Sequence, residues 1–244
     1  MEQANPITIT LDGRQVRTTE GRMVLDIARE HKVRIPTLCH HESLTPSGAC
    51  RLCVVEARHK GWSKVVVSCL YPVWDGVEIL TASPRAVAVR KLVLELLLAR
   101  CPDVPVVRDL AREYGIEEPR YAKENNDCIL CGLCVKACDE IVGVHALSMQ
   151  GRGATKLVDT PYGGPSDACI ACGSCAYVCP TDCIKVSDRD GVRHIWHRDY
   201  PLKYCRSCGS LIGPEAQLAY FTRIASLPAD FYDLCKGCRA TGRA

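Results

Sequence analysis

Two cysteine-rich runs decide the fold: CILCGLCVKAC at residues 128–138 and CIACGSCAYVCP at residues 169–180. Both runs space their cysteines as C-x2-C-x2-C-x3-C, which makes the region 127–198 an internal duplication. Three thiolates on one tight loop can surround an iron–sulfur cube, while the fourth, beyond the loop, reaches the neighbouring cube. Eight cysteines at this doubled spacing favour two [4Fe–4S] clusters over zinc or unmodified thiols.

In this pattern, the fourth cysteine of each run binds the cluster that the other run holds, and this rule assigns the ligands. One cluster is expected to bind Cys128, Cys131, Cys134 and Cys179, and the other Cys138, Cys169, Cys172 and Cys175. Gly132 and Gly173 lie inside the loops, where the backbone must approach a cluster closely. The first run departs from the bacterial ferredoxin pattern because Asp139, rather than proline, follows Cys138, but the ligand set stays intact.

Apart from its eighteen cysteines, the chain has the composition of an ordinary folded protein. Of its 244 residues, 47% are hydrophobic and 24% charged, and the net charge of +3 is scattered, so nucleic acid is not expected as a partner. The first residues lack the basic and apolar regions of a signal peptide, which favours metal sites in a reducing compartment, the cytoplasm, over a secreted disulfide framework. The longest apolar run, Leu92–Ala99, contains Glu95 and is too short to span a bilayer, so no direct membrane insertion is expected.

A second group of cysteines lies near the N-terminus, among segments with the pattern of a small mixed sheet. The pattern predicts a hairpin at Asp12-Gly13 and a helix over residues 22–31. Strands are expected at residues 7–11, 15–18, 51–58 and 64–69. The cysteines of this region are Cys39, Cys50, Cys53 and Cys69. Four thiolates with a close central pair suit a [2Fe–2S] cluster, and the spacing alone leaves zinc as the alternative.

A long helix is expected after this region. Ser83 is a suitable N-cap, Pro84 suits the first helical position, and the helix should end near Arg100. Its expected apolar face consists of Val87, Leu92, Val93, Leu96 and Leu97. Residues 102–126 contain three prolines, many charges and no long periodic segment, and they are interpreted as a connector.

The C-terminal region carries a third group, Cys205, Cys208, Cys235 and Cys238, as two Cys-x2-Cys pairs around a helical stretch at 215–225. Paired knuckles of this kind are typical of a structural zinc ribbon, in which one ion stabilises a tail too short to build its own core. A third [4Fe–4S] cluster is the first alternative, and a redox disulfide pair the second. Cys183 is interpreted as a thiol packed in the core.

Several segments together resemble a known family. They are IPTLC at 35–39, GACRLCVVE at 48–56, RKLVLELLL at 90–98 and CILCGLCVKAC at 128–138. They resemble the iron–sulfur subunit of respiratory complex I and the related diaphorase and hydrogenase subunits of NAD-linked complexes. The resemblance implies an α+β chain with a β-grasp [2Fe–2S] domain and a two-cluster ferredoxin domain. It also favours [2Fe–2S] over zinc for the N-terminal cysteines.

The chain departs from this family between the two domains. The family usually carries a further cluster there, held by one histidine and three cysteines. The matching positions are Cys101, Pro105, Arg108 and Tyr114, so no cluster is expected in this chain. Two hypotheses follow for electron transfer: the [2Fe–2S] site exchanges electrons with a neighbouring subunit, or the two domains pack more closely.

The expected organisation is a [2Fe–2S] domain at 1–82, a helix and connector at 83–126, a ferredoxin domain at 127–198 and a four-cysteine metal tail at 199–244. We find no dinucleotide-binding glycine motif, no P-loop and no nucleophile–base motif. The resemblance therefore implies a non-catalytic electron relay in an NAD(P)H-linked oxidoreductase of the hydrogenase, formate dehydrogenase or electron-bifurcating type. Its partners would be a flavin- and NAD(P)-binding subunit and a catalytic subunit. The alternatives are a free-standing multi-cluster carrier and a zinc-only interaction protein.

Overall fold

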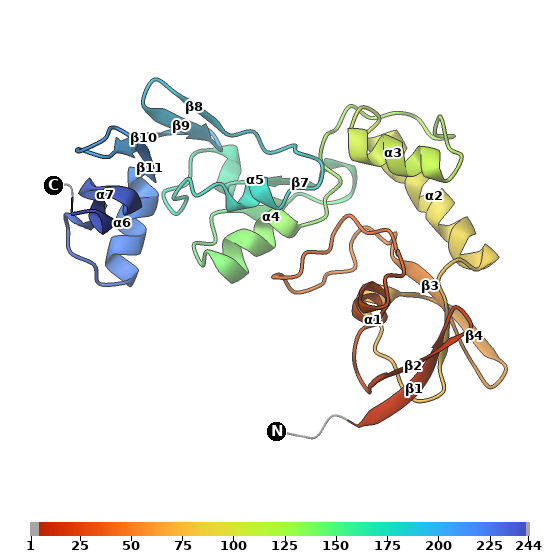
Figure 1. Cartoon of the computed structure of the whole chain (residues 1–244). Coiled ribbons are helices and arrows are strands. Elements are labelled where there is room, and N and C mark those ends of the chain that lie inside the picture. Colours follow the sequence, from red (N-terminus) through yellow and green to blue (C-terminus); the bar gives the residue numbers. More distant parts are fainter. Residues whose placement is uncertain (1–4, 243–244) are drawn as a thin grey trace. The chain divides into compact units, whose positions relative to one another are not determined.

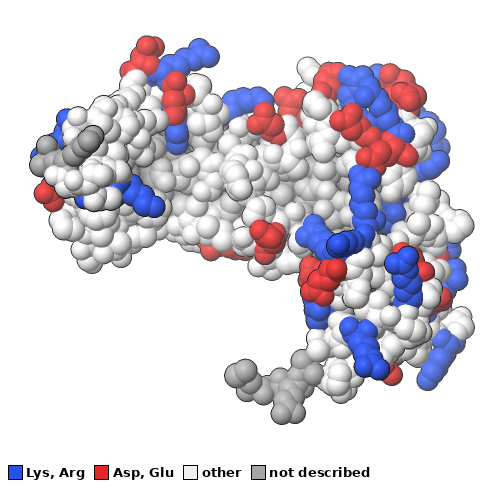
Figure 2. Space-filling model, in the orientation of Figure 1, with Lys and Arg blue, Asp and Glu red and all other residues white. Residues whose placement is uncertain are grey.

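The computed structural model describes residues 5–242, and the chain divides into two compact units (Figure 1). The first unit ends at Leu133 and the second begins at Cys134. Charged side chains of both signs are interspersed over the face drawn in Figure 2, in keeping with the net charge of +3. Within residues 5–242, every helix falls short of the length and apolarity that crossing a membrane requires.

A five-stranded sheet forms the centre of the first unit, in the order β2-β1-β5-β3-β4. Its strands are β1 (Pro6–Leu11), β2 (Arg14–Thr19), β3 (Val54–His59), β4 (Trp62–Val67) and β5 (Glu78–Leu80). The pairs β1–β2 and β3–β4 are antiparallel hairpins, whereas β1 and β5 run parallel. The predicted Asp12-Gly13 turn is confirmed, because both residues adopt the left-handed conformation, with φ of 47° and 80°.

Helix α1 (Val24–Glu30) packs on this sheet through its apolar side. Its buried residues join alternate residues of β1 in one core, among them Leu25, Ile27, Ile9 and Leu11. A short 3₁₀ turn, η1 (Ser68–Leu70), follows β4. The helix and the four strands expected from the sequence are therefore confirmed, and they form the mixed sheet with a crossing helix that the β-grasp resemblance implied.

Helix α2 (Pro84–Arg100) has the predicted cap, because the Ser83 hydroxyl accepts a hydrogen bond from the Ala86 amide at 3.2 Å. Its predicted apolar face is wrong: Leu92 and Leu96 are 43% and 49% exposed. The buried residues are Ala86, Arg90, Leu94, Leu98 and Ala99. Ala86, Arg90, Leu94 and Leu98 follow one another at intervals of four residues and therefore lie along one side of the helix. Arg90 interrupts the apolar pattern of this buried side.

The connector expected over residues 102–126 contains a helix that was not predicted from the sequence, α3 (Pro105–Glu113). Val107, Leu110 and Ala111 are its buried residues, and the helix packs against α2. A nine-residue helix beginning at a proline gives only two turns of periodicity, too short to stand out among the surrounding prolines and charges.

The second unit contains short elements around its cysteines. Helix α4 (Leu133–Lys136) begins at the end of the first unit and continues as a π-helical turn, η2 (Ala137–Ile141). Strands β6 (Ser148–Gln150) and β7 (Leu157–Asp159) pair, with 3₁₀ turns η3 (Gly153–Thr155) and η4 (Pro161–Gly163) nearby in sequence. Helix α5 (Ser174–Tyr177) follows the second cysteine loop.

A four-stranded antiparallel sheet, in the order β11-β10-β9-β8, leads from this region into the C-terminal tail. Its strands are β8 (Ser187–Arg189), β9 (Val192–Ile195), β10 (Arg198–Tyr204) and β11 (Leu211–Pro214). Helix α6 (Glu215–Ile224), the 3₁₀ turn η5 (Phe231–Asp233) and helix α7 (Lys236–Ala240) complete the chain. The helical stretch predicted at 215–225 is confirmed by α6.

Candidate metal centres

The four N-terminal cysteines are brought together in the first unit. Cys39, Cys50 and Cys53 lie between α1 and β3, and Cys69 lies in η1; all four are at most 6% exposed. They form two pairs: the Cys53 and Cys69 sulfurs are 3.5 Å apart, and the thiols of Cys39 and Cys50 are hydrogen-bonded to each other. A [2Fe–2S] cluster takes two thiolates on each of two irons, so two close pairs fit this group.

Backbone amides point at these sulfurs. The Cys50 amide donates to the Cys39 sulfur at 3.3 Å, and the Leu38 amide donates to the Cys50 sulfur at 3.5 Å. The hydrogen bond with Cys39 lowers the pKa of Cys50 to about 6, and that with Cys69 lowers the pKa of Cys53 to about 6. One thiolate in each pair therefore forms readily, as binding of a metal requires.

A buried arginine supports the loop that carries Cys53. Arg90, on α2, is 3% exposed and donates to the carbonyls on both sides of that cysteine, Leu52 at 3.2 Å and Val54 at 2.5 Å. It also donates to the Thr81 carbonyl at 2.7 Å. This contact could not be predicted from the sequence, because Arg90 and Leu52 are 38 residues apart and a helical arginine is usually solvated.

The two cysteine loops of the ferredoxin region repeat each other in conformation. Leu130 and Ala171, at matching positions, both have φ of 55°, and Gly132 and Gly173 have φ of 79° and 77°. Left-handed backbone is common at glycine and uncommon elsewhere, so its recurrence at matching non-glycine residues shows that each run has the same local shape. The internal duplication inferred from the cysteine spacing is thus also a duplication of conformation.

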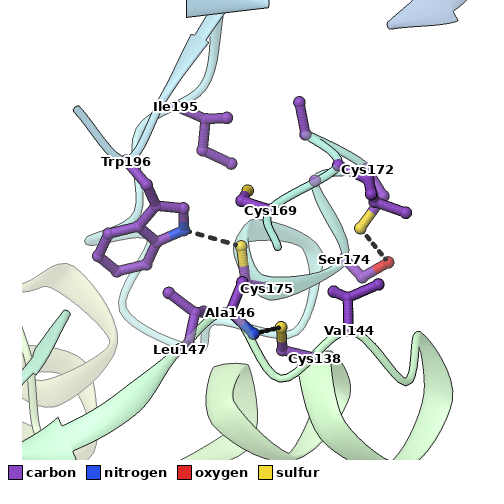
Figure 3. Close-up of a pocket in the computed structure, with 13 residues that line it drawn as sticks. Cys138, Val144, Ala146, Leu147, Cys169, Cys172, Ser174, Cys175, Ile195 and Trp196 are labelled. Atoms are coloured by element: carbon purple, nitrogen blue, oxygen red, sulfur yellow. Dashed lines mark hydrogen bonds between the residues drawn. The ribbon is translucent and has the colours of Figure 1, made fainter. Parts of the chain in front are cut away.

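One of the two expected [4Fe–4S] ligand sets lies within the second unit. Cys138, Cys169, Cys172 and Cys175 line a single cavity, together with Trp196 and apolar residues (Figure 3). Cys138 comes from the first run, carried by η2, so the structure brings it to the three cysteines of the second loop. The indole nitrogen of Trp196 donates to the Cys175 sulfur at 3.3 Å, and the Ala146 amide donates to the Cys138 sulfur at 3.2 Å (Figure 3). A sulfur-lined cavity with N–H groups aimed at its sulfurs fits an iron–sulfur cluster.

The other expected ligand set is Cys128, Cys131, Cys134 and Cys179, and its assignment to one cluster stays a prediction. The Arg100 guanidinium, at the end of α2, donates to the Cys128 carbonyl at 2.8 Å. Cys183, interpreted from the sequence as a core thiol, packs on the core of the second unit and has its sulfur 3.5 Å from that of Cys179. This contact lowers the pKa of Cys179 to about 4.

The C-terminal cysteines form the tightest group. The sulfurs of Cys205, Cys208, Cys235 and Cys238 all lie within 4.8 Å of one another, and those of Cys208 and Cys235 are 3.7 Å apart. Cys205 directly follows β10, whereas Cys235 precedes α7 and Cys238 lies in its first turn. The Cys235 amide donates to the Cys205 sulfur at 3.3 Å. Backbone amides, that of Cys235 first, lower the pKa of Cys205 to about 6. The four cysteines expected from the sequence to form one group are therefore brought together, with their sulfurs close enough to share one metal ion.

The positions that would hold a further cluster in the family have other roles here. Cys101 is fully buried at the C-terminal end of α2, and burial raises its pKa to about 11. The Tyr114 hydroxyl accepts a hydrogen bond from Arg90 at 3.3 Å, and Pro105 begins α3. The segment after α2 is thus a packed helix that supports the Arg90 contact.

Comparisons with known proteins agree with this geometry. Residues 4–84 match the family described as "2Fe-2S iron-sulfur cluster binding domain", and residues 127–183 match "4Fe-4S dicluster domain". The chain is 34% identical over 200 residues to the NADPH-Fe(3+) oxidoreductase subunit alpha of Geobacter sulfurreducens, covering 72% of this chain and 23% of that protein. It is 32% identical over 207 residues to the NADP-reducing hydrogenase subunit HndD of Solidesulfovibrio fructosivorans, covering 72% of this chain and 35% of that protein.

A chain of known structure is also similar to this protein. In the crystal structure of an NAD+-reducing [NiFe]-hydrogenase in the H2-reduced state, one chain matches with a TM-score of 0.54 and 32% identity, over 64% of this chain and 75% of that one. The chain spans 23% to 35% of the length of the two curated relatives just named. By these matches, the chain belongs to the family of iron–sulfur subunits of NAD-linked oxidoreductase and hydrogenase complexes.

Proposed function

We propose that this chain is an electron relay within a multi-subunit NAD(P)H-linked oxidoreductase, and that it catalyses no reaction by itself. The observation that carries the proposal is the cavity lined by four cysteines from two sequence runs, whose sulfurs receive hydrogen bonds from N–H groups (Figure 3). Such donors favour the more negative, reduced form of a sulfur-bound cluster, which is what an electron carrier needs.

The proposed ligands follow the expectations from the sequence. The [2Fe–2S] cluster is held by Cys39, Cys50, Cys53 and Cys69. One [4Fe–4S] cluster is held by Cys128, Cys131, Cys134 and Cys179, and the other by Cys138, Cys169, Cys172 and Cys175. When bound, each cluster supplies a site that accepts one electron and later releases one, without breaking a bond. The protein contributes burial, which excludes water, and hydrogen bonds, which set the energy of the added charge.

For the C-terminal cysteines we propose one structural zinc ion. Four thiolates on one tetrahedral zinc ion, with Zn–S distances of about 2.3 Å, place their sulfurs about 3.8 Å apart. The observed separation of 3.7 Å between Cys208 and Cys235 supports a single ion. A [4Fe–4S] cluster binds its four thiolates on four different irons and therefore holds them further apart. The ion would join β10 to α7 and stabilise the tail.

The proposed partners are a flavin- and NAD(P)-binding subunit, which would exchange electrons with the chain, and a catalytic subunit, which would use or supply them. The names of the relatives support this proposal, since they are subunits of NADPH-, NADP- and NAD+-linked enzymes. The proposed compartment is a reducing one, the cytoplasm, where thiolates stay available to iron.

The test is a count of iron, acid-labile sulfide and zinc per chain after anaerobic purification from the native organism, with the co-purifying proteins identified. We expect about ten iron, about ten sulfide and about one zinc, together with a flavoprotein. About fourteen iron without zinc would show that the tail holds a third [4Fe–4S] cluster. A colourless protein without sulfide would contradict the relay, and a coloured protein that purifies alone would favour a free-standing carrier.

A further inference from the structure

The hairpin formed by β9 and β10 directs two polar side chains toward the cysteines of one cluster site. Trp196 lies in its turn, and its indole nitrogen donates to the Cys175 sulfur at 3.3 Å (Figure 3). Tyr200, on β10, packs in the same core as Cys138 and Cys175. The hairpin lies beyond residues 127–183, the part that matches the dicluster domain, so its contacts are additional to that domain.

The turn has an unusual conformation for its sequence. Ile195 pairs with Arg198, which leaves a two-residue turn of Trp196 and His197, with φ of 49° and 63°. Two-residue turns of this left-handed type prefer Asn-Gly, because bulky residues are strained there. The contacts of the two side chains offset that strain: Trp196 bonds Cys175, and the His197 Nε2 lies 2.8 Å from the Asp159 carboxylate. Such strain persists where the surrounding structure demands it, often at functional sites.

The Tyr200 hydroxyl is a buried donor without an acceptor. The residue is 3% exposed, and its hydroxyl makes no hydrogen bond within the described residues. The hydroxyl lies near the Cys169 sulfur, and a phenolic O–H can donate a hydrogen bond to such an acceptor. An unsatisfied buried hydroxyl is costly, and an acceptor at the Cys169 thiolate or at a cluster sulfide would remove that cost.

A third contact fixes the hairpin against the cluster loop. Arg193, on β9, donates from one nitrogen to the Ala171 carbonyl at 3.1 Å, inside the loop that carries Cys169 and Cys172. The rest of its guanidinium forms two hydrogen bonds of 2.8 Å with the Asp188 carboxylate. Hence β9, the turn and β10 each reach the same site.

We propose that the β9–β10 hairpin sets the reduction potential of the cluster held by Cys138, Cys169, Cys172 and Cys175. Trp196 donates a hydrogen bond to the Cys175 sulfur, and Tyr200 would donate one to the Cys169 thiolate or to a cluster sulfide once the cluster is bound. Both act as positioning and tuning residues. Reduction adds one electron to the cluster, and its negative charge spreads onto the sulfurs. Donors to those sulfurs stabilise the reduced form more than the oxidised form, so they raise the potential. The inference rests on the proposed function, since it requires a cluster at this site.

The test compares the full-length chain with Trp196→Phe, Tyr200→Phe and the double variant. Each substitution removes the donor and keeps an aromatic ring, and Tyr200→Phe removes a single oxygen atom. The matched control is Tyr204→Phe, on the same strand, where the side chain is 47% exposed. Trp62→Phe, in the first unit and 43% exposed, is the control for tryptophan. Iron and sulfide are counted first, and each protein is then titrated anaerobically with detection of the reduced clusters by electron paramagnetic resonance.

We expect the variants to keep about ten iron and to shift one [4Fe–4S] step to lower potential, leaving the other [4Fe–4S] step and the [2Fe–2S] step in place. Each substitution should lower the reduced-to-oxidised ratio at a given potential roughly threefold to tenfold, where tenfold is about 59 mV for one electron. Full iron content with unchanged potentials in both single variants, or equal shifts in the controls, would overturn the inference alone. Wild-type protein without iron and sulfide would overturn the proposed function and this inference with it.

Discussion

At the scale of single residues, Arg90 is the clearest case of a side chain that links the fold to the site. It is a buried cation that donates to three backbone carbonyls, two of which flank Cys53. A buried charge is costly unless it is compensated, and here carbonyl dipoles provide the compensation. The same guanidinium ties α2 to the loop before β3, so a single residue holds the helix and the cluster-binding loop together.

Replacing Arg90 by methionine should therefore destabilise the first unit by about 3 kcal/mol, because three buried carbonyls lose their donor. The measurement is urea unfolding followed by loss of the [2Fe–2S] absorbance. Lys91→Met is the control, since Lys91 is the next residue of α2 and is exposed. A variant as stable as this control would show that the carbonyl contacts contribute nothing.

Glu56 makes the stability of the same unit depend on pH. It is 2% exposed on β3, and hydrogen bonds from Ser83, Ser63 and Arg58 lower its pKa from 4.5 to about 2. Because the folded pKa lies below the unfolded value, its contribution is fully present above pH 4.5 and is lost as the pH falls from 4.5 toward 2.

Glu56→Gln should accordingly flatten the fall in stability on the acid side. The comparison is the urea midpoint of both proteins at several pH values between about 5 and 2.5, read from tryptophan fluorescence. If the two midpoints decline in parallel, the Glu56 carboxylate is not the group responsible.

At the scale of elements, strand β10 connects two of the proposed metal centres within the second unit. Tyr200 lies on it beside one proposed cluster site, and Cys205, a proposed ligand of the C-terminal metal, directly follows its last residue. The strand pairs with β9 on one side and β11 on the other. An ion bound at the C-terminal cysteines would therefore fix the far end of the strand that carries Tyr200.

Removing one ligand of that ion tests its identity. Cys208→Ser changes the exposed member of the group and should reduce zinc from about one per chain to near zero, while iron stays at about ten. Lys236→Ala is the control, because this exposed residue lies inside the Cys235–Cys238 knuckle and is no ligand. A loss of about four iron in Cys208→Ser would instead identify a [4Fe–4S] cluster.

The elements also show how far the sequence could be interpreted. The β1–β2 hairpin, α1 and α2 followed from alternation, Asp12-Gly13 and the Ser83 cap, which are local signals. The prediction of the buried face of α2 was wrong because a buried arginine carries no apolar signal. Helix α3 was missed because two turns are too few to show a helical period in the sequence. The contact of Trp196 with Cys175 joins residues 21 apart through a hairpin, which cysteine spacing cannot reveal.

At the scale of the whole molecule, three cysteine groups that the sequence singled out are each accompanied by supporting contacts in the structure. The N-terminal cysteines form two sulfur pairs, and one set of ferredoxin cysteines lines a cavity. The four C-terminal sulfurs all lie within 4.8 Å of one another. These differences in sulfur geometry match the different centres proposed for them.

The central claim is that this chain stores and passes single electrons on three clusters. An anaerobic reductive titration of the purified full-length chain, with reducing equivalents counted against absorbance and electron paramagnetic resonance, tests it most directly. The account predicts about three electrons per chain, one in a [2Fe–2S] signal and two in [4Fe–4S] signals. Uptake of one electron or none by protein with its full iron content would contradict it.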